Sequence, residues 1–188
     1  VNTYPGVSDA VVDDSDLAPD TGKPFNRAQS LRFGVGFFSF GLLWIVGLMI
    51  VAAVLLPQRL TDIGVASPEA LFGTINAITA VVSLVSNLVF GNLSDRTRSR
   101  FGRRAPWILA GAVIGGVSLT LVGVLDNPVL LTISYCLSMV GLNMMLAPAV
   151  AVLADRVPMR VRGTMSAYYG AGVAAGAPLG SLVGAGFI

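Results

Sequence analysis

The sequence predicts an all-α, polytopic transmembrane helical bundle with five membrane-spanning helices. Of its 188 residues, 54% are hydrophobic and only 12% are charged, which is about half the charged share of an average soluble domain. Five long segments contain no charged residue. Lysines and arginines are concentrated in the polar segments on one side of these spans. Together these observations favour a membrane protein over a soluble domain.

The N-terminal segment, residues 1–24, differs in composition from the rest of the chain. It combines prolines and glycines with five aspartates, Asp9, Asp13, Asp14, Asp16 and Asp20. Because it has little hydrophobic periodicity, we expect a disordered acidic cytoplasmic tail. It lacks the basic start, short apolar core and small-residue cleavage site of a secretory signal.

Residues 25–188 form the predicted transmembrane bundle. A helix needs about 20 apolar residues to cross about 30 Å of hydrocarbon, and each uncharged segment reaches that length. Long apolar runs without alternation favour helices over a closed barrel. The predicted spans are residues 33–56, 70–94, 105–125, 129–154 and 163–188.

The distribution of basic residues predicts the orientation. Eleven of the 12 lysines and arginines precede the first span or lie between the second and third or the fourth and fifth spans. On the opposite side only Arg59 occurs, in the loop 57–69, and the tight turn 126–128 has none. Basic residues near span ends stay in the cytoplasm. We therefore predict a multi-pass protein of the cell membrane, embedded in the lipid bilayer, with a cytoplasmic N-terminus.

Several classes of function are not favoured by the composition. The chain has no histidine, and Cys136 is its only cysteine, so no disulfide can form within it and a metal site is not expected. No combination of nucleophile, base and orienting group suggests an enzyme. No feature indicates a cofactor or a nucleic-acid partner.

A four-residue pattern recurs at the end of the second and fourth spans, as Leu-Ser-Asp-Arg (93–96) and Leu-Ala-Asp-Arg (153–156). Asp95 and Asp155 then lie at the negative end of a helix dipole, which costs up to about 1 kcal/mol without compensation. We expect cationic partners for them among Arg98, Arg100, Arg103, Arg104, Arg160 and Arg162. The alternative is that these are solvated interfacial charges that only set the topology.

The segment between the second and third spans contains Gly91, Leu93, Asp95 and Arg96, followed by Gly102, Arg103 and Arg104. This pattern resembles the cytoplasmic loop signature of the major facilitator superfamily of secondary transporters. Residues 97–100 lengthen the usual spacing, and the ending Arg-Phe-Gly-Arg-Arg-x-Pro-Trp is similar to that of the glycoside, pentoside and hexuronide cation symporters and the plant sucrose carriers. Pro158 with Arg162-Gly163 resembles a second loop pattern of the superfamily. The resemblance leaves the acidic tail uncovered.

The resemblance implies the N-terminal half of a secondary active transporter. Complete members resemble two six-span bundles around a central cavity, and symport of a sugar or similar small solute by alternating access is expected. A cytoplasmic gate latch that stabilises the outward-open state would involve Gly91, Asp95, Arg96, Gly102, Arg103, Arg104, Asp155 and Arg162. The partner would be the missing C-terminal half. The alternative is a truncated, non-transporting membrane subunit that packs within a larger complex.

The second span carries a polar stripe of Asn76, Ala80, Ser83 and Asn87, spaced three or four residues apart. Such a stripe lines a solute path or, more commonly, bonds to neighbouring helices. Melibiose-type symporters have two aspartates where this sequence has Ser83 and Asn87, which argues against a sodium site of that kind. Other candidates for solute contact, with helix packing as the alternative, are Trp44, Tyr135 and Asn143.

The fifth span has glycines at every fourth position, namely Gly172, Gly176, Gly180 and Gly184. Glycines on one stripe allow a second helix to approach closely, as in other small-residue packing motifs. We therefore predict a close helix–helix contact along this stripe.

Overall fold

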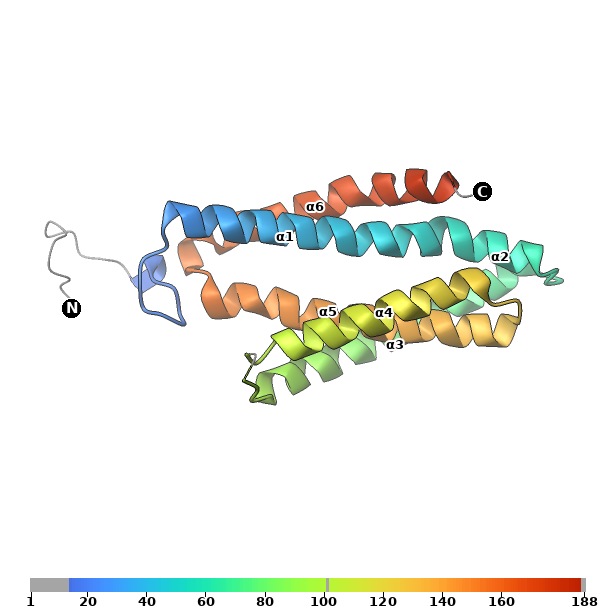
Figure 1. Ribbon diagram of the computed structural model, residues 1–188, viewed down its shortest axis with the longest axis horizontal. Helices are drawn as coiled ribbons and strands as arrows, with labels where there is room; N and C mark the ends of the chain where they lie inside the picture. The colour runs from blue at the N-terminus through green and yellow to red at the C-terminus, as the bar shows by residue number, and fades with distance from the viewer. Residues whose placement is uncertain (1–13, 101, 187–188) are drawn as a thin grey trace, which may run out of the picture.

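The computed structural model describes residues 14–100 and 102–186, and in these ranges all named elements are helices. Helix α1 (Arg27–Met49), a π-helical segment η2 (Ile50–Leu55) and α2 (Leu56–Asp62) follow one another without a break. They are followed by α3 (Pro68–Arg96), α4 (Ala105–Val124), α5 (Pro128–Arg156) and α6 (Met159–Ala185) (Figure 1). The predicted all-α bundle is confirmed.

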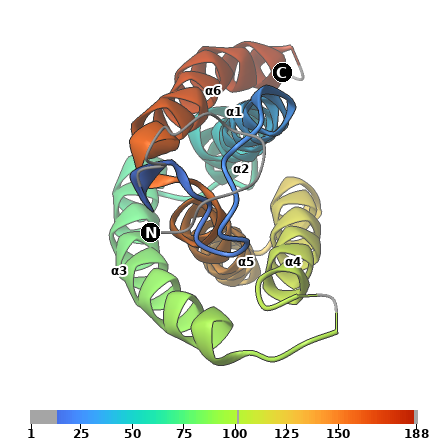
Figure 2. The same cartoon turned by 90° about the vertical axis from the view of Figure 1, so that its left-hand side faces the viewer.

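Four of these helical segments are long and apolar enough to cross a membrane: Arg27–Asp62, Pro68–Arg96, Ala105–Val124 and Pro128–Arg156. Helix α6 is long enough, with 27 residues, but it is not among the helices apolar enough to cross a membrane. It lies along α1 in both views of the bundle (Figures 1 and 2). The chain is therefore a multi-pass membrane protein in which the fifth predicted span is the least hydrophobic.

The predicted loop 57–69 is wrong for its first half, because the helix continues to Asp62 and α3 begins at Pro68. Pro57 lies in the first turn of α2, immediately after the π-helical segment. Proline lacks the N–H that a regular helix needs at an interior position, whereas a π-helical insertion already interrupts the regular bonding pattern. The chain thus passes Pro57 without ending the helix.

Helix α5 lies at the centre of the bundle, with α3 and α4 on different sides of it and α1 and α6 beyond (Figure 2). The hydrophobic core forms where η2, α2 and the start of α3 meet the end of α4 and the start of α5. Its most buried members are Leu56, Leu60, Ile75, Val122 and Leu131. The bundle is therefore most tightly closed at the end that carries the α2–α3 and α4–α5 connections.

The opposite end, called here the arginine-rich end, carries the N-terminal segment, the α3–α4 loop and the α5–α6 turn (Figure 1). Eleven of the 12 lysines and arginines belong to these segments or the adjoining helix ends. Arg59 is at the other end, where it bonds the Asp126 carboxylate at 2.7 Å and the Leu125 carbonyl at 3.0 Å. The structure thus gathers the basic residues as the predicted topology requires.

Residues 1–13 of the predicted tail lie outside the described residues. Residues 14–24 differ from the predicted disorder, because they hold a 3-10 helix (Asp14–Asp16) and an isolated bridge between Leu17 and Pro24. Asp16 pairs with Arg160 at 3.1 Å and Asp20 with Arg156 at 3.6 Å. These contacts hold the acidic segment against the arginine-rich end.

Candidate functional site

Arg104 is the centre of the candidate site. Its side chain is 9% exposed and bonds three groups from two other helices. The Nε atom donates to Asp155 Oδ2 at 2.6 Å, Nη2 contacts Asp95 Oδ1 at 2.9 Å, and Nη1 donates to Ser94 Oγ at 3.1 Å. One guanidinium at the start of α4 therefore joins the C-terminal ends of α3 and α5.

The loop between α3 and α4 positions this guanidinium. Gly102 has a φ of +93°, a conformation that residues with a Cβ rarely adopt, and Arg104 is the residue that precedes α4. On the same loop, Trp107 Nε1 donates to Thr97 Oγ1 at 2.8 Å, and Thr97 Oγ1 donates to the Leu93 carbonyl. Gly102 thus permits the turn, and the hydrogen bond between Trp107 and Thr97 stabilises it.

Both aspartates of the repeated pattern have a cation, but in unequal environments. Asp155 is 33% exposed and forms ion pairs with Arg104 and Arg103, the latter at 3.2 Å between Oδ2 and Nη2. Asp95 is 58% exposed. Burial lowers the pKa of Arg104, but the hydrogen bond that Arg104 donates to Asp155 and the charges of Asp155 and Asp95 outweigh this effect and raise the pKa overall. Arg104 is therefore a permanent cation.

The arginines of the α5–α6 turn do not pair with these aspartates. Arg162 donates from Nε to the Val157 carbonyl at 2.9 Å and from Nη2 to the Ala154 carbonyl at 2.8 Å. It neutralises the end of α5 through backbone carbonyls, which a cation at a helix C-terminus does favourably. Arg160 pairs with Asp16 instead. Of the six candidate arginines, Arg104 and Arg103 thus pair with these aspartates, and Arg160 and Arg162 have other partners.

The remaining motif residues surround this cluster. Gly91 faces α5, where an added Cβ would lie 3.9 Å from Ala147 Cβ. Arg96 is exposed at the end of α3. Ser94, Thr97 and Trp107 were missed from the sequence, although a hydroxyl directly before an aspartate at a helix end is a signal that polar neighbours are needed there.

The candidate solute-path residues fall into two groups. Asn87 Nδ2 on α3 donates to Asn143 Oδ1 on α5 at 3.2 Å, and Asn143 is buried. Trp44 Nε1 lies 3.4 Å from the Leu142 carbonyl, and Tyr135 is buried in the core. In the arrangement described, these four side chains contact neighbouring helices.

Asn76 and Ser83 differ from those four. Asn76 is exposed and donates to its own helix at Phe72, while Ser83 is half-buried. The buried polar side chains of α3 are instead Thr79, Ser86 and Ser94. The predicted stripe is therefore turned partly away from α5.

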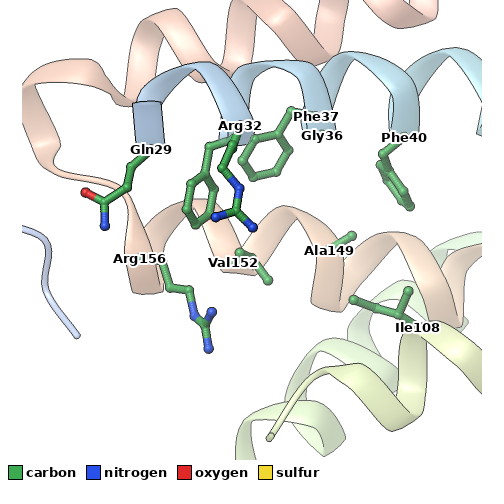
Figure 3. Close-up of a pocket in the computed structure, with 10 residues that line it drawn as sticks. Gln29, Arg32, Gly36, Phe37, Phe40, Ile108, Ala149, Val152 and Arg156 are labelled. Atoms are coloured by element: carbon green, nitrogen blue, oxygen red, sulfur yellow. The ribbon is translucent and has the colours of Figure 1, made fainter. Parts of the chain in front are cut away.

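Two open cavities lie toward the arginine-rich end. One of about 450 Å³ is formed by α3, α5 and α6, and its lining includes Asn87, Ala147, Ala151, Arg162 and Tyr169. The other, of about 490 Å³, lies between α1, α4 and α5 (Figure 3). It is lined by Gln29, Arg32, Phe33, Gly36, Phe37, Phe40, Ile108, Ala149, Val152 and Arg156. Both volumes fall in the range of small-molecule sites.

The glycine stripe of α6 lies against α1 and, at Gly184, against the π-helical segment η2 that follows it. A Cβ at Gly172 would clash with the Phe38 carbonyl oxygen, and one at Gly176 with the Ile45 side chain. At Gly180 it would come within 2.7 Å of the Val46 carbonyl oxygen, and at Gly184 within 3.0 Å of the Val54 side chain. The two helices can approach this closely only because these positions carry no side chain.

Comparison with known proteins gives a consistent picture. The family model of the Major Facilitator Superfamily matches residues 32–188. An uncharacterized symporter of Synechocystis is 44% identical over 54 residues, 29% of this chain and 10% of that protein. An inner membrane symporter of Escherichia coli is 38% identical over 50 residues, 27% and 11% of the two chains. The general alpha-glucoside permease of Schizosaccharomyces pombe is 31% identical over 112 residues, 51% and 20%.

These matches cover between 10% and 20% of the relatives' own lengths. No solved structure matches the chain.

Proposed function

Because this chain belongs to the Major Facilitator Superfamily, we propose that it is the N-terminal half of a secondary transporter that moves a small solute across the cell membrane by alternating access. Two relatives are named symporters and a third an alpha-glucoside permease. Symport of a sugar or a similar solute is therefore the first activity to test. The arginine-rich end would face the cytoplasm.

The observation that carries this proposal is the position of Arg104 between the ends of α3 and α5. A gate needs an element with two discrete arrangements whose balance small free energies can shift. Arg104 would hold these helix ends together in one arrangement. The half-exposed Asp95 carboxylate leaves room for a group from the second half of the transporter. The pairing of Asp95 with Arg104 would thus respond to the position of the second half.

The cavity between α3, α5 and α6 is the proposed start of the solute path. Asn87 is the one sequence-predicted path residue that lines it, and it can exchange its bond to Asn143 for a solute hydroxyl. Tyr169 adds an aromatic surface in the same lining. Three other predicted path residues do not line this cavity and would act by packing against neighbouring helices: Trp44, Tyr135 and Asn143.

The activity is tested with the full-length protein in proteoliposomes, by following uptake of labelled alpha-glucosides under an imposed sodium or proton gradient. We expect uptake above that of protein-free vesicles, and accumulation that depends on one of the two gradients. If no sugar or related solute enters, and the chain instead copurifies in fixed ratio with other membrane proteins, the transporter proposal fails and a subunit role replaces it.

A variant separates solute binding from coupling. No carboxylate occurs in the middle of α3, and intramembrane carboxylates are the usual carriers of ion coupling. Asn87→Ala should therefore raise the solute concentration needed for half-maximal uptake and leave the gradient dependence unchanged, and Ser83→Ala is the neighbouring control. Loss of gradient dependence in Asn87→Ala would mean that α3 holds the coupling site.

A further inference from the structure

The cavity between α1, α4 and α5 has an uneven lining. Phe33, Phe37 and Phe40 on α1 face Ala149 and Val152 on α5, and Ile108 of α4 closes one side. Figure 3 shows Phe37 and Phe40 directed from α1 into the space above α5. None of these side chains can bond a solute hydroxyl, so this part of the cavity suits an apolar occupant.

The polar side chains of the lining all lie toward one end. Gln29 and Arg32 are near the start of α1, and Arg156 is the last residue of α5. In Figure 3 the Arg32 and Arg156 guanidinium groups lie at the same end, beyond Phe37. This end is the arginine-rich end, where the bundle meets the membrane surface.

We propose that this cavity binds an anionic phospholipid, with its phosphate on Arg32 and Arg156 and an acyl chain along the phenylalanines. Two cations at the mouth match a headgroup phosphate, which arginine binds with charge-assisted hydrogen bonds. Basic pockets between helices at the membrane surface are suited to anionic headgroups. The inference rests on the membrane location of the chain and on this face staying open to lipid in the full-length protein, and it does not depend on transport.

The described part of the acidic N-terminal segment, residues 14–24, contributes no residue to the lining of this cavity. Asp20 pairs with Arg156 at 3.6 Å, and the two side chains are 37% and 60% exposed. Such a long, solvated pair contributes little free energy. A phosphate group can therefore replace Asp20, and the acidic segment becomes a weak competitor for the same arginine.

The probes are phosphatidylglycerol and phosphatidylcholine with identical acyl chains, titrated onto the full-length, delipidated protein and counted by native mass spectrometry. We expect phosphatidylglycerol to bind roughly 30-fold more tightly, because two arginines near the surface contribute roughly 1 kcal/mol each. Millimolar inorganic phosphate should not displace it, because phosphate lacks the acyl chain. Full displacement by inorganic phosphate would replace the lipid site with a simple anion site and overturn the proposal.

Two variants test the two ends of the cavity. Arg32→Ala with Arg156→Ala should abolish the preference for phosphatidylglycerol, whereas Arg27→Ala with Arg98→Ala removes the same charge outside the cavity and should preserve it. Gly36→Leu places an apolar side chain in the cavity, and its Cβ meets nothing within 4 Å. It should weaken phosphatidylglycerol binding with all charges intact.

Equal lipid preference in both double variants, or unchanged binding in Gly36→Leu, would mean that lipid does not occupy this cavity and that another protein segment covers it. Thermal unfolding measured on each variant without added lipid identifies any loss of binding that comes from misfolding. Only a variant that unfolds like the unmodified protein counts in the comparison.

Discussion

Among single residues of the described part of the chain, Arg104 joins the ends of two helices through a buried charge. It is buried, it is charged, and each of its three nitrogen groups has a partner. Removing one member of such a cluster leaves the others with unmatched charge, which costs far more than removing an exposed ion pair. Its neighbour Arg103 makes a single bond to Asp155 and is 48% exposed.

This contrast gives a matched pair of substitutions. Arg104→Ala should lower the free energy of unfolding by about 2–3 kcal/mol, because Ser94 and Asp155 lose a buried partner. Arg103→Ala should cost less than about 1 kcal/mol. Arg104→Lys should recover only part of the loss, since an ammonium cannot reproduce the fork of bonds. Thermal unfolding in detergent measures all three, and equal losses at positions 103 and 104 would contradict the assignment.

The sequence predicted the need for a cation beside Asp95 and Asp155 but not which arginine supplies it. Six arginines were within reach along the chain, and the choice depends on the turn that Gly102 makes and on the register of α3 against α5. Neither is encoded in local composition. The dipole argument correctly indicated compensation at the end of α5, but Arg162 supplies part of it through carbonyl groups.

At the scale of helices, two pairs are held together by glycine. Gly172 and its three companions bring α6 against α1, and Gly111, Gly115 and Gly141 bring α4 against α5. The periodicity of α6 made its stripe predictable from sequence alone. The α4–α5 contact was not predicted, although Gly111 and Gly115 have the same four-residue spacing, because a single pair is a weaker signal than four glycines in register and Gly141 is the one glycine of α5.

The α6 stripe can be tested with two glycines on the same helix. Gly172→Ala should destabilise the protein by about 1–3 kcal/mol, because the added methyl group meets the backbone of α1. Gly170→Ala meets nothing within 4 Å and should be neutral or stabilising by up to about 1 kcal/mol, from the higher helix propensity of alanine. The pair is compared by thermal unfolding, and the same sign at both positions would refute the close contact.

Helix boundaries were predicted well where polar residues mark them and poorly where they do not. Helix α4 begins at Ala105 and α5 at Pro128, close to the expected positions. The first helix continues past Pro57, because the π-helical segment already interrupts the regular hydrogen bonding before the proline. The continuation also depends on the packing of Leu56 and Leu60 in the core, which a search for uncharged runs does not detect.

In the whole molecule, the tight core and the open cavities lie at opposite ends. Core residues gather where α2 meets α3, while both cavities include residues near the arginine-rich end. The bundle thus combines a firmly packed end with one where the ends of α3 and α5 are joined by the ion pairs of Arg104. Composition and charge predicted the fold class and the gathering of basic residues at one end, but this difference in packing required the structure.

The orientation is checked by labelling single cysteines in intact cells, in a Cys136→Ser background. A cysteine at Thr61, near the end of α2, should react with an impermeant maleimide added outside. A cysteine at Ser99, in the α3–α4 loop, should react only after the cells are opened. The positive-inside distribution of 11 basic residues is the physical reason, and the reverse labelling pattern would invert the topology.

The central claim is that the Arg104 cluster is a latch between two states, and Asp95→Asn in the full-length protein tests it most directly. Asparagine keeps the shape of the side chain but removes the charge that pairs with Arg104 at 2.9 Å. A few kcal/mol is enough to shift such an equilibrium. The measurement is the labelling rate, from each side of sealed vesicles, of a cysteine replacing Ala151 in the cavity lining.

With normal membrane insertion and slower solute uptake, Asp95→Asn should increase labelling from the arginine-rich side and decrease it from the opposite side. Identical labelling rates from both sides in the variant and the unmodified protein would contradict a conformational role and leave Asp95 as a surface charge.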